Sequence, residues 1–271
     1  MLKRLLLPGL VLASTCGADA AVVVPHRAIY ELQMLRSSQG ANLGSVAGRM
    51  AYEVTGSECD GWTVSFRLVN NFDYKEGNSR LIDTQSSSWE TGDGTEMSYS
   101  EKAFIDNKPD AEKRLMVQRQ SKDGVGEGKI TLPKEQTFSI TGDTIFPMRH
   151  QLRLMDAAEK GESRDISVVY DGSDNAKPVR AISTIGRKIG PGESKEDSSN
   201  PNASELKDLP SWPVSIGYYP VDDKDAETPS YQISFDMYEN GVSTGLVMDY
   251  GNFALSGKLS HLEFLKPETC K

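Results

Sequence analysis

Apolar and polar residues alternate along many short segments of the chain. In segment 62–68, Trp62, Val64 and Phe66 are separated by polar residues, and a similar period of two recurs over 28–34 and 231–237. This period is typical of a β-strand with one buried face. We expect further strands at 44–55, 78–90, 95–105, 112–119, 126–131, 165–170, 178–187, 213–220, 243–250 and 253–265. The pattern predicts an all-β fold.

Turn residues separate these segments at short spacing. Asn240-Gly241 lies between two alternating runs and predicts a type I′ hairpin. Glycine turns also occur at 92–94, 123–124 and 171–172. Antiparallel strands so close in sequence predict a barrel, a sandwich or a strongly curled sheet.

One segment has a helical pattern. Pro147 suits the first turn of a helix, and Met148, Leu152 and Met155 follow at helical spacing. Gly161 can end the helix. We expect its single apolar stripe to pack on a sheet face or to fill a concavity.

Residues 190–208 are polar and aperiodic, and they predict a mobile loop. The segment could link two domains, but similar strands lie on both sides of it. We therefore expect one domain over residues 21–271 with this loop inserted between strands.

The N-terminus has the pattern of an export signal. Lys3 and Arg4 precede a short apolar run, and Ala18-Asp19-Ala20 fits a cleavage site, so residues 1–20 are expected to be removed near Ala20. The run is too short to span a bilayer, which argues against stable membrane insertion. Cys16 leaves lipidation as an alternative. A periplasmic location is expected.

Cleavage leaves two cysteines, Cys59 and Cys270. The periplasm is oxidising, which favours a disulfide between them over two free thiols. The bond would close a loop of about 211 residues and contribute on the order of 5 kcal/mol through chain entropy.

The chain is acidic, with a net charge of -9. Loss of residues 1–20 removes two basic groups and one acidic group, which makes the charge -10. An acidic domain repels nucleic-acid phosphates, so a nucleic-acid partner is not expected. A local apolar groove for a lipid tail remains compatible with this charge.

No pattern indicates a metal, a cofactor or catalytic residues. The three histidines form no zinc motif, and the two cysteines are far apart in sequence. Gly241-Val242-Ser243-Thr244-Gly245 matches a hydrolase elbow, with His261 downstream. A strand rather than the required helix follows Ser243, so a hydrolase using Ser243 and His261 is kept only as an alternative.

Large aromatic and sulfur-containing side chains are the remaining candidates for ligand binding. They either fill the core or line an apolar groove. The candidates are Trp89, Trp212, Tyr218, Met148 and Met155.

Several short motifs together resemble one family. The chain carries His26-Arg27-Ala28-Ile29-Tyr30-Glu31-Leu32, then Cys59-Asp60-Gly61-Trp62, Phe146-Pro147-Met148-Arg149-His150, Tyr170-Asp171-Gly172-Ser173, Asn240-Gly241-Val242-Ser243, Asp249-Tyr250-Gly251, Leu262-Glu263 and Cys270. Their order resembles that of the EipB family of periplasmic cell-envelope integrity proteins from alphaproteobacteria.

This resemblance implies a β-spiral, a long curled antiparallel sheet with one or two helices in its concavity, similar to an open barrel of the LolA and LolB kind. It implies a disulfide between Cys59 and Cys270 and a role in envelope integrity under stress. It supplies no catalytic residues. We expect a non-enzymatic factor that binds a lipid, a lipoprotein or an envelope protein. A hydrolase and a purely structural partner-binding module are the alternatives.

Overall fold

A computed structural model describes residues 22–194, 201–223 and 225–267. The predicted export signal, Cys16 and Cys270 lie outside these residues. The strands are β1 (His26–Ser37), β2 (Leu43–Ser57), β3 (Gly61–Tyr74), β4 (Ser79–Glu90), β5 (Glu96–Ile105), β6 (Lys108–Gln118), β7 (Gly126–Leu132), β8 (Gln136–Ile140), β9 (Thr144–Ile145), β10 (Arg164–Val169), β11 (Val179–Ile185), β12 (Ser211–Pro220), β13 (Tyr231–Tyr238), β14 (Ser243–Asp249) and β15 (Phe253–Phe264). The helices are α1 (Pro147–Glu159) and the short 3-10 helices η1 (Gln39–Ala41) and η2 (Pro201–Leu206).

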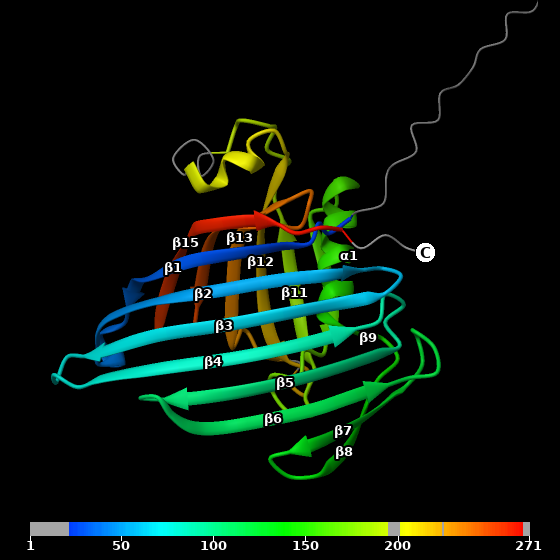
Figure 1. Ribbon diagram of the computed structural model, residues 1–271, viewed down its shortest axis with the longest axis horizontal. Helices are drawn as coiled ribbons and strands as arrows, with labels where there is room; N and C mark the ends of the chain where they lie inside the picture. Colours follow the sequence, from blue (N-terminus) through cyan, green and yellow to red (C-terminus); the bar gives the residue numbers. More distant parts are fainter. Residues whose placement is uncertain (1–21, 195–200, 224, 268–271) are drawn as a thin grey trace, which may run out of the picture.

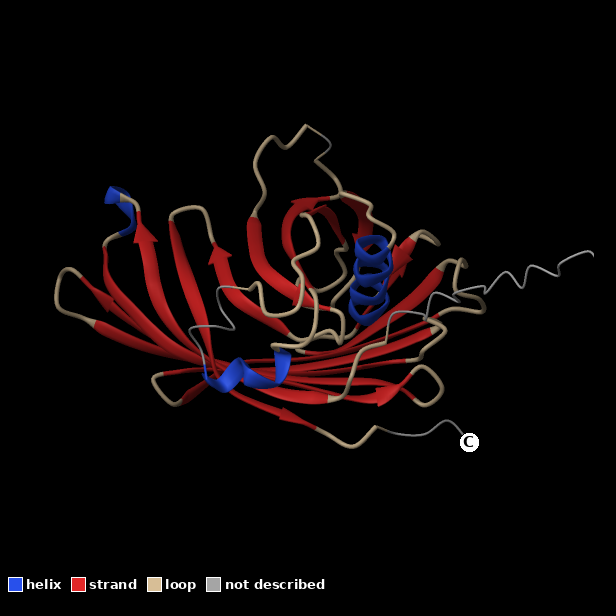
Figure 2. Ribbon diagram, turned by 90° about the horizontal axis from the view of Figure 1, so that it is seen from above, coloured by secondary structure: helices blue, strands red, loops and turns tan. Residues whose placement is uncertain are grey.

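All strands belong to one 15-stranded sheet, which confirms the predicted all-β fold. β1 to β8 form one arm in chain order, β15 back to β9 forms the other, and the pairing of β1 with β15 joins them. Every pairing is antiparallel except that of β9 with β10. The first arm runs across the front in Figure 1, with β11 to β13 behind it, and Figure 2 shows how the sheet curls around α1.

The structure corrects one turn and adds two strands. Asn240 does not have a positive φ, so the hairpin between β13 and β14 is not of type I′, although Gly241 has a φ of 85°. Asp106 and Asn107 both have positive φ and connect β5 to β6. Strands β8 and β9 were not predicted, because five and two residues are too few for a clear alternation.

Part of the predicted loop 190–208 is a helix. Residues 195–200 lie outside the described part, but η2 follows them and buries Ala203 and Leu206 completely. These residues are three apart, so they share one side of a 3-10 helix. They pack on a core cluster that includes Tyr30, Leu32 and Tyr238.

Helix α1 lies within the concavity of the sheet, as the sequence predicts (Figure 2). Met148 and Met155 are buried, but the middle of the apolar face is Leu154, whereas Leu152 is only partly buried. The buried residues of this face belong to the same core cluster as Trp62 and Trp212. At the end of the helix, Gly161 has a φ of 73° and donates its backbone N–H to Ala158. This is the glycine cap that the sequence predicts.

A buried carboxylate holds the N-terminus of α1. The residue before the helix, Phe146, has no capping side chain, but Glu90 of β4 lies there and is only 2% exposed. Its Oε1 accepts the backbone N–H of Met148 at 2.6 Å, and the carboxylate also accepts that of Arg149. Burial raises the pKa of Glu90 to about 7, although these two hydrogen bonds oppose the shift. Glu90 thus ties α1 to the first arm of the sheet.

The sheet order places Cys59 near the end of the described chain. Cys59 lies in the turn between β2 and β3, beside the ends of β1 and β15, where Leu265 donates its N–H to Pro25. Two strand spacings, about 10 Å, separate β2 from β15. Cys270 follows Pro267 by three residues, and three residues of extended chain cover about 10 Å. The pairing of Cys59 with Cys270 remains a prediction that this topology permits.

We predict that Glu90 makes the stability of the fold fall as the pH rises. Its pKa is higher in the folded protein than in the unfolded chain, so its stabilisation is full below about pH 4.5 and is lost as the pH rises to about 7. Between about pH 5 and pH 8, wild type should lose about 3 kcal/mol of unfolding free energy relative to Glu90→Gln. Urea unfolding at both pH values measures this difference.

Burial of His150 lowers its pKa to about 4, which has the opposite effect on stability, but it acts equally in both proteins and cancels from the difference. The matched control is Glu76→Gln, at an exposed glutamate in the turn after β3. A difference between wild type and Glu90→Gln that does not change with pH would contradict the prediction.

We also predict that reduction of the disulfide lowers the melting temperature substantially. The bond would close a long loop and hold the C-terminal segment, and its contribution is on the order of 5 kcal/mol. Cys59→Ser and Cys270→Ser should each have the melting temperature of the reduced wild type. An unchanged melting curve after verified reduction would remove the disulfide from this account.

Candidate functional site

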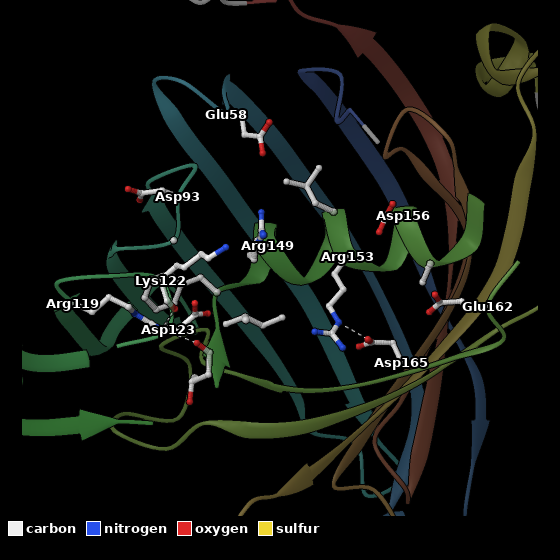
Figure 3. Close-up of a pocket in the computed structure, with 16 residues that line it drawn as sticks. Glu58, Asp93, Arg119, Lys122, Asp123, Arg149, Arg153, Asp156, Glu162 and Asp165 are labelled. Carbon is white, nitrogen blue, oxygen red and sulfur yellow. Dashed lines mark hydrogen bonds and ion pairs between the residues drawn. The ribbon is translucent and has the colours of Figure 1, made fainter. Parts of the chain in front are cut away.

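A polar cavity of about 500 Å³ follows the outward face of α1 (Figure 3). Arg149, Leu152, Arg153 and Asp156 recur at helical spacing and line its length. The turns after β2, β4 and β6, together with β9 and the start of β10, supply most of the remaining walls. The other lining residues are Glu58, Asp93, Gly94, Arg119, Lys122, Asp123, Thr144, Ile145, Phe146, Ala157, Glu162 and Asp165.

A second cavity, of about 590 Å³, adjoins the first above the same turns. The two share Glu58, Asp93, Lys122 and Arg149, and the second also borders Cys59. Both cavities therefore open around the first turn of α1.

Arg119 is the most unusual residue of this region because it is charged and only 8% exposed. Its Nη1 donates to the carbonyl oxygens of Lys122 and Thr144, both at 3.0 Å. Within the described residues, its Nε and Nη2 have no hydrogen-bond partner. The guanidinium lies over the ring of Phe146, 4.7 Å from its centroid. Burial lowers the pKa of Arg119, and the nearby Asp123 opposes that effect.

A partly buried ion pair closes the other end of the cavity. Arg153 donates to Asp165 at 2.5 Å, and Ser167 donates to the second carboxylate oxygen at 2.6 Å. His150 faces this carboxylate with its Nε2, 3.8 Å away, too far for a hydrogen bond. Because its ring is buried, it is neutral near pH 7. The carboxylate of Asp165 is therefore satisfied within the protein, whereas His150 Nε2 has no hydrogen-bond partner among the described residues.

A row of five aromatic rings lies elsewhere on the sheet, and we call it the aromatic row. Each ring contacts the next, with centroid distances of 4.8 to 6.0 Å, and all five are partly buried. Its members, in spatial order, are Phe72, Phe253, Tyr250, Tyr231 and Tyr218.

The aromatic row and the cavities lie at opposite ends of the curled, barrel-like sheet, which we call the barrel. Phe253 pairs with Ser37 at the end of β1, whereas α1 and Glu58 lie near His26 at its start. β1 is 12 residues long, so about 35 Å separates the two regions.

The five residues that the sequence proposes for ligand binding do not come together. Met148, Met155 and Trp212 are buried in the core beneath α1 and leave no surface for a ligand. Trp89 is 36% exposed, but it alternates with the inward-facing Glu90 and so points outward from the sheet. Tyr218 belongs to the aromatic row. None of the five lines either cavity.

The residues of the alternative hydrolase do not form a catalytic arrangement. Ser243 begins strand β14, no helix follows it, and His261 is exposed on β15. The described residues contain no hydrogen bond between their side chains. The described part of the chain contains no group of three or more histidine, cysteine, aspartate or glutamate side chains placed to hold a metal ion. Among residues 22–194, 201–223 and 225–267, no helix is long and apolar enough to cross a membrane.

Sequence reasoning missed the cavity and most of the aromatic row. Arg119, Lys122 and Arg149 come from a turn and a helix that are distant in sequence, and no motif links them. For the aromatic row, one signal was available. Tyr231, Tyr250 and Phe253 all lie at the ends of predicted strands, and neighbouring antiparallel strands can bring such ends together.

Comparison with known proteins agrees with the fold. A solved β-barrel-like protein of a domain of unknown function from Brucella abortus is similar, with 32% sequence identity and a TM-score of 0.82, over 91% of this chain and all of that one. The cell envelope integrity protein EipB of Brucella abortus is 34% identical over 91% of this chain and 86% of that protein. The model of the EipB-like family matches residues 17–266. The chain therefore belongs to the EipB-like family.

Proposed function

We propose that this protein maintains the integrity of the cell envelope from the periplasm, without catalysis, by binding the apolar part of an envelope lipid or lipoprotein. Its relative in Brucella abortus is named for cell envelope integrity, which supports the first part. The expected export signal supports the location. The aromatic row is the observation that carries the binding part.

The chemistry of the aromatic row suits an apolar chain. Its rings form a continuous series of contacts, and each ring packs against the core on one side while it stays partly exposed. Burial raises the pKa of Tyr218, Tyr231 and Tyr250, so their phenols stay neutral at physiological pH. The neutral aromatic row provides contact area for an acyl chain, and its rings carry no charge that would attract a charged ligand.

The α1 end of the barrel does not offer such a surface. Its interior is filled by the core around Met155 and Trp212, and the cavities outside it are lined largely by charged side chains. An apolar ligand is therefore expected at the aromatic row alone. A protein partner that covers the row is the alternative outcome of the test.

We predict that an aromatic-row variant loses lipid binding. Native mass spectrometry of the protein purified from its own periplasm should reveal a lipid bound to wild type. Tyr231→Ser combined with Phe253→Ser should lose that lipid, because two adjacent rings are removed from the middle of the row. The same variant should bind the neutral probe N-phenyl-1-naphthylamine at least about tenfold more weakly, as the lost apolar area is worth more than 1.4 kcal/mol.

The matched control is Met116→Ser combined with Ile166→Ser, since both residues are exposed and lie outside the aromatic row. Far-UV circular dichroism checks that both variants are folded. A different outcome is that wild type purifies without lipid but with an envelope protein that the aromatic-row variant does not retain. That result would show that the row binds a protein partner and not a lipid. Equal loss in both variants would show that the row is not the site.

A further inference from the structure

From the groups around Arg119, we infer a second binding site, in the cavity beside the first turn of α1, that takes a phosphate-bearing anion. Three cationic side chains line this part of the cavity, and we call them the cationic corner: Arg119, Lys122 and Arg149 (Figure 3). The inference does not depend on the aromatic row, which lies at the opposite end of the barrel.

The buried member of the cationic corner has unused hydrogen-bonding capacity. Two nitrogens of the Arg119 guanidinium have no partner among the described residues, and the residue is 8% exposed. A buried charge without full hydrogen bonding is costly, and it persists where a ligand or another function requires it. No ion pair connects Arg119 to a carboxylate in the described part of the chain, and its two hydrogen bonds go to backbone carbonyls.

The two exposed members can donate directly to a ligand. Lys122 and Arg149 form no ion pair within the described residues, and both border the two cavities. Figure 3 shows Lys122 reaching from the turn after β6 toward Arg149 on the helix. Arg119 lies below them and adds positive charge from the wall.

Three of the six carboxylates that line the cavity are engaged by other groups. Asp165 is paired with Arg153, and Asp156 is paired with Lys160 at 2.5 Å. The side chain of Asp93 accepts the backbone N–H and the hydroxyl of Thr95 within its own turn. Asp123 lies near Arg119, while Glu162 lies at the far end of α1 in Figure 3. The cationic corner therefore carries three cations against the carboxylates of Glu58, Asp93 and Asp123 in the adjoining walls, of which Asp93 is already hydrogen-bonded to Thr95.

These groups match phosphate better than a single carboxylate. Arginine and lysine together offer both bidentate and point-charge contacts, which suits a group with several oxygens and about two negative charges. The N-terminus of α1 adds a favourable dipole, although Glu90 already accepts its first N–H groups. A cavity of about 500 Å³ has room for a lipid headgroup or a small phosphate ester.

Isothermal titration with sodium pyrophosphate tests the site directly. Wild type should bind the probe, and Lys122→Glu combined with Arg149→Glu should bind it at least about tenfold more weakly, because two charge-assisted contacts are lost. The control is Lys108→Glu combined with Arg187→Glu, which makes the same change of charge at exposed residues outside the cavity. This control should bind like wild type, within about twofold.

Two further measurements identify the source of the phosphate and the role of Arg119. Titration with glycerol 3-phosphate represents a soluble ester, and cosedimentation with phosphatidylglycerol or phosphatidylcholine vesicles represents a headgroup. Arg119→Gln, checked by its melting temperature, should also weaken pyrophosphate binding. Tyr231→Ser combined with Phe253→Ser should leave it unchanged, which separates this site from the proposed function.

The inference fails if wild type gives neither heat nor a shift in melting temperature with millimolar pyrophosphate. It fails equally if the control variant weakens binding as much as the cationic-corner variant does, since the effect would then come from overall charge.

Discussion

The rest of the structure depends on the packing of α1 against the concave face of the curled sheet. The helix fills one end of the concavity of the 15-stranded sheet and carries much of the core there. Glu90 fixes where the helix begins, because its buried carboxylate accepts N–H groups that the sequence before Pro147 leaves uncapped. The turns around this end then form the cavities outside the helix.

The two ends of the barrel consequently differ in chemistry. Near α1 the interior is closed by Trp62, Trp212 and the methionines, and charged groups collect on the outside. Helix α1 does not extend to the other end, where aromatic rings remain partly exposed on the same strands. One end of the sheet therefore carries an apolar surface, and the other end carries a polar cavity that includes the cationic corner, about 35 Å away. A ligand with an apolar chain is expected at one end, and an anion at the other.

Buried ionisable groups have different degrees of satisfaction in this fold. Glu90 and Asp165 accept hydrogen bonds from the helix and from neighbouring side chains, and these contacts serve the structure. Arg119 is only partly satisfied by two carbonyl oxygens. Since an unsatisfied buried charge is costly, this difference distinguishes a structural group from one placed to bind a ligand.

The sequence by itself determined the β class, most strands, and the helix with its proline start and glycine end, because alternation and caps are local properties of the chain. It could not show that Met148, Met155 and Trp212 lie in the core rather than in a groove, since an apolar side chain suits both places equally. Only the tertiary structure decided this, together with the meeting of Arg119 and Arg149 and the contact of Phe72 with Phe253. Those contacts depend on how far the sheet curls and on which strands become neighbours, and residues that are distant in sequence carry no local signal of either.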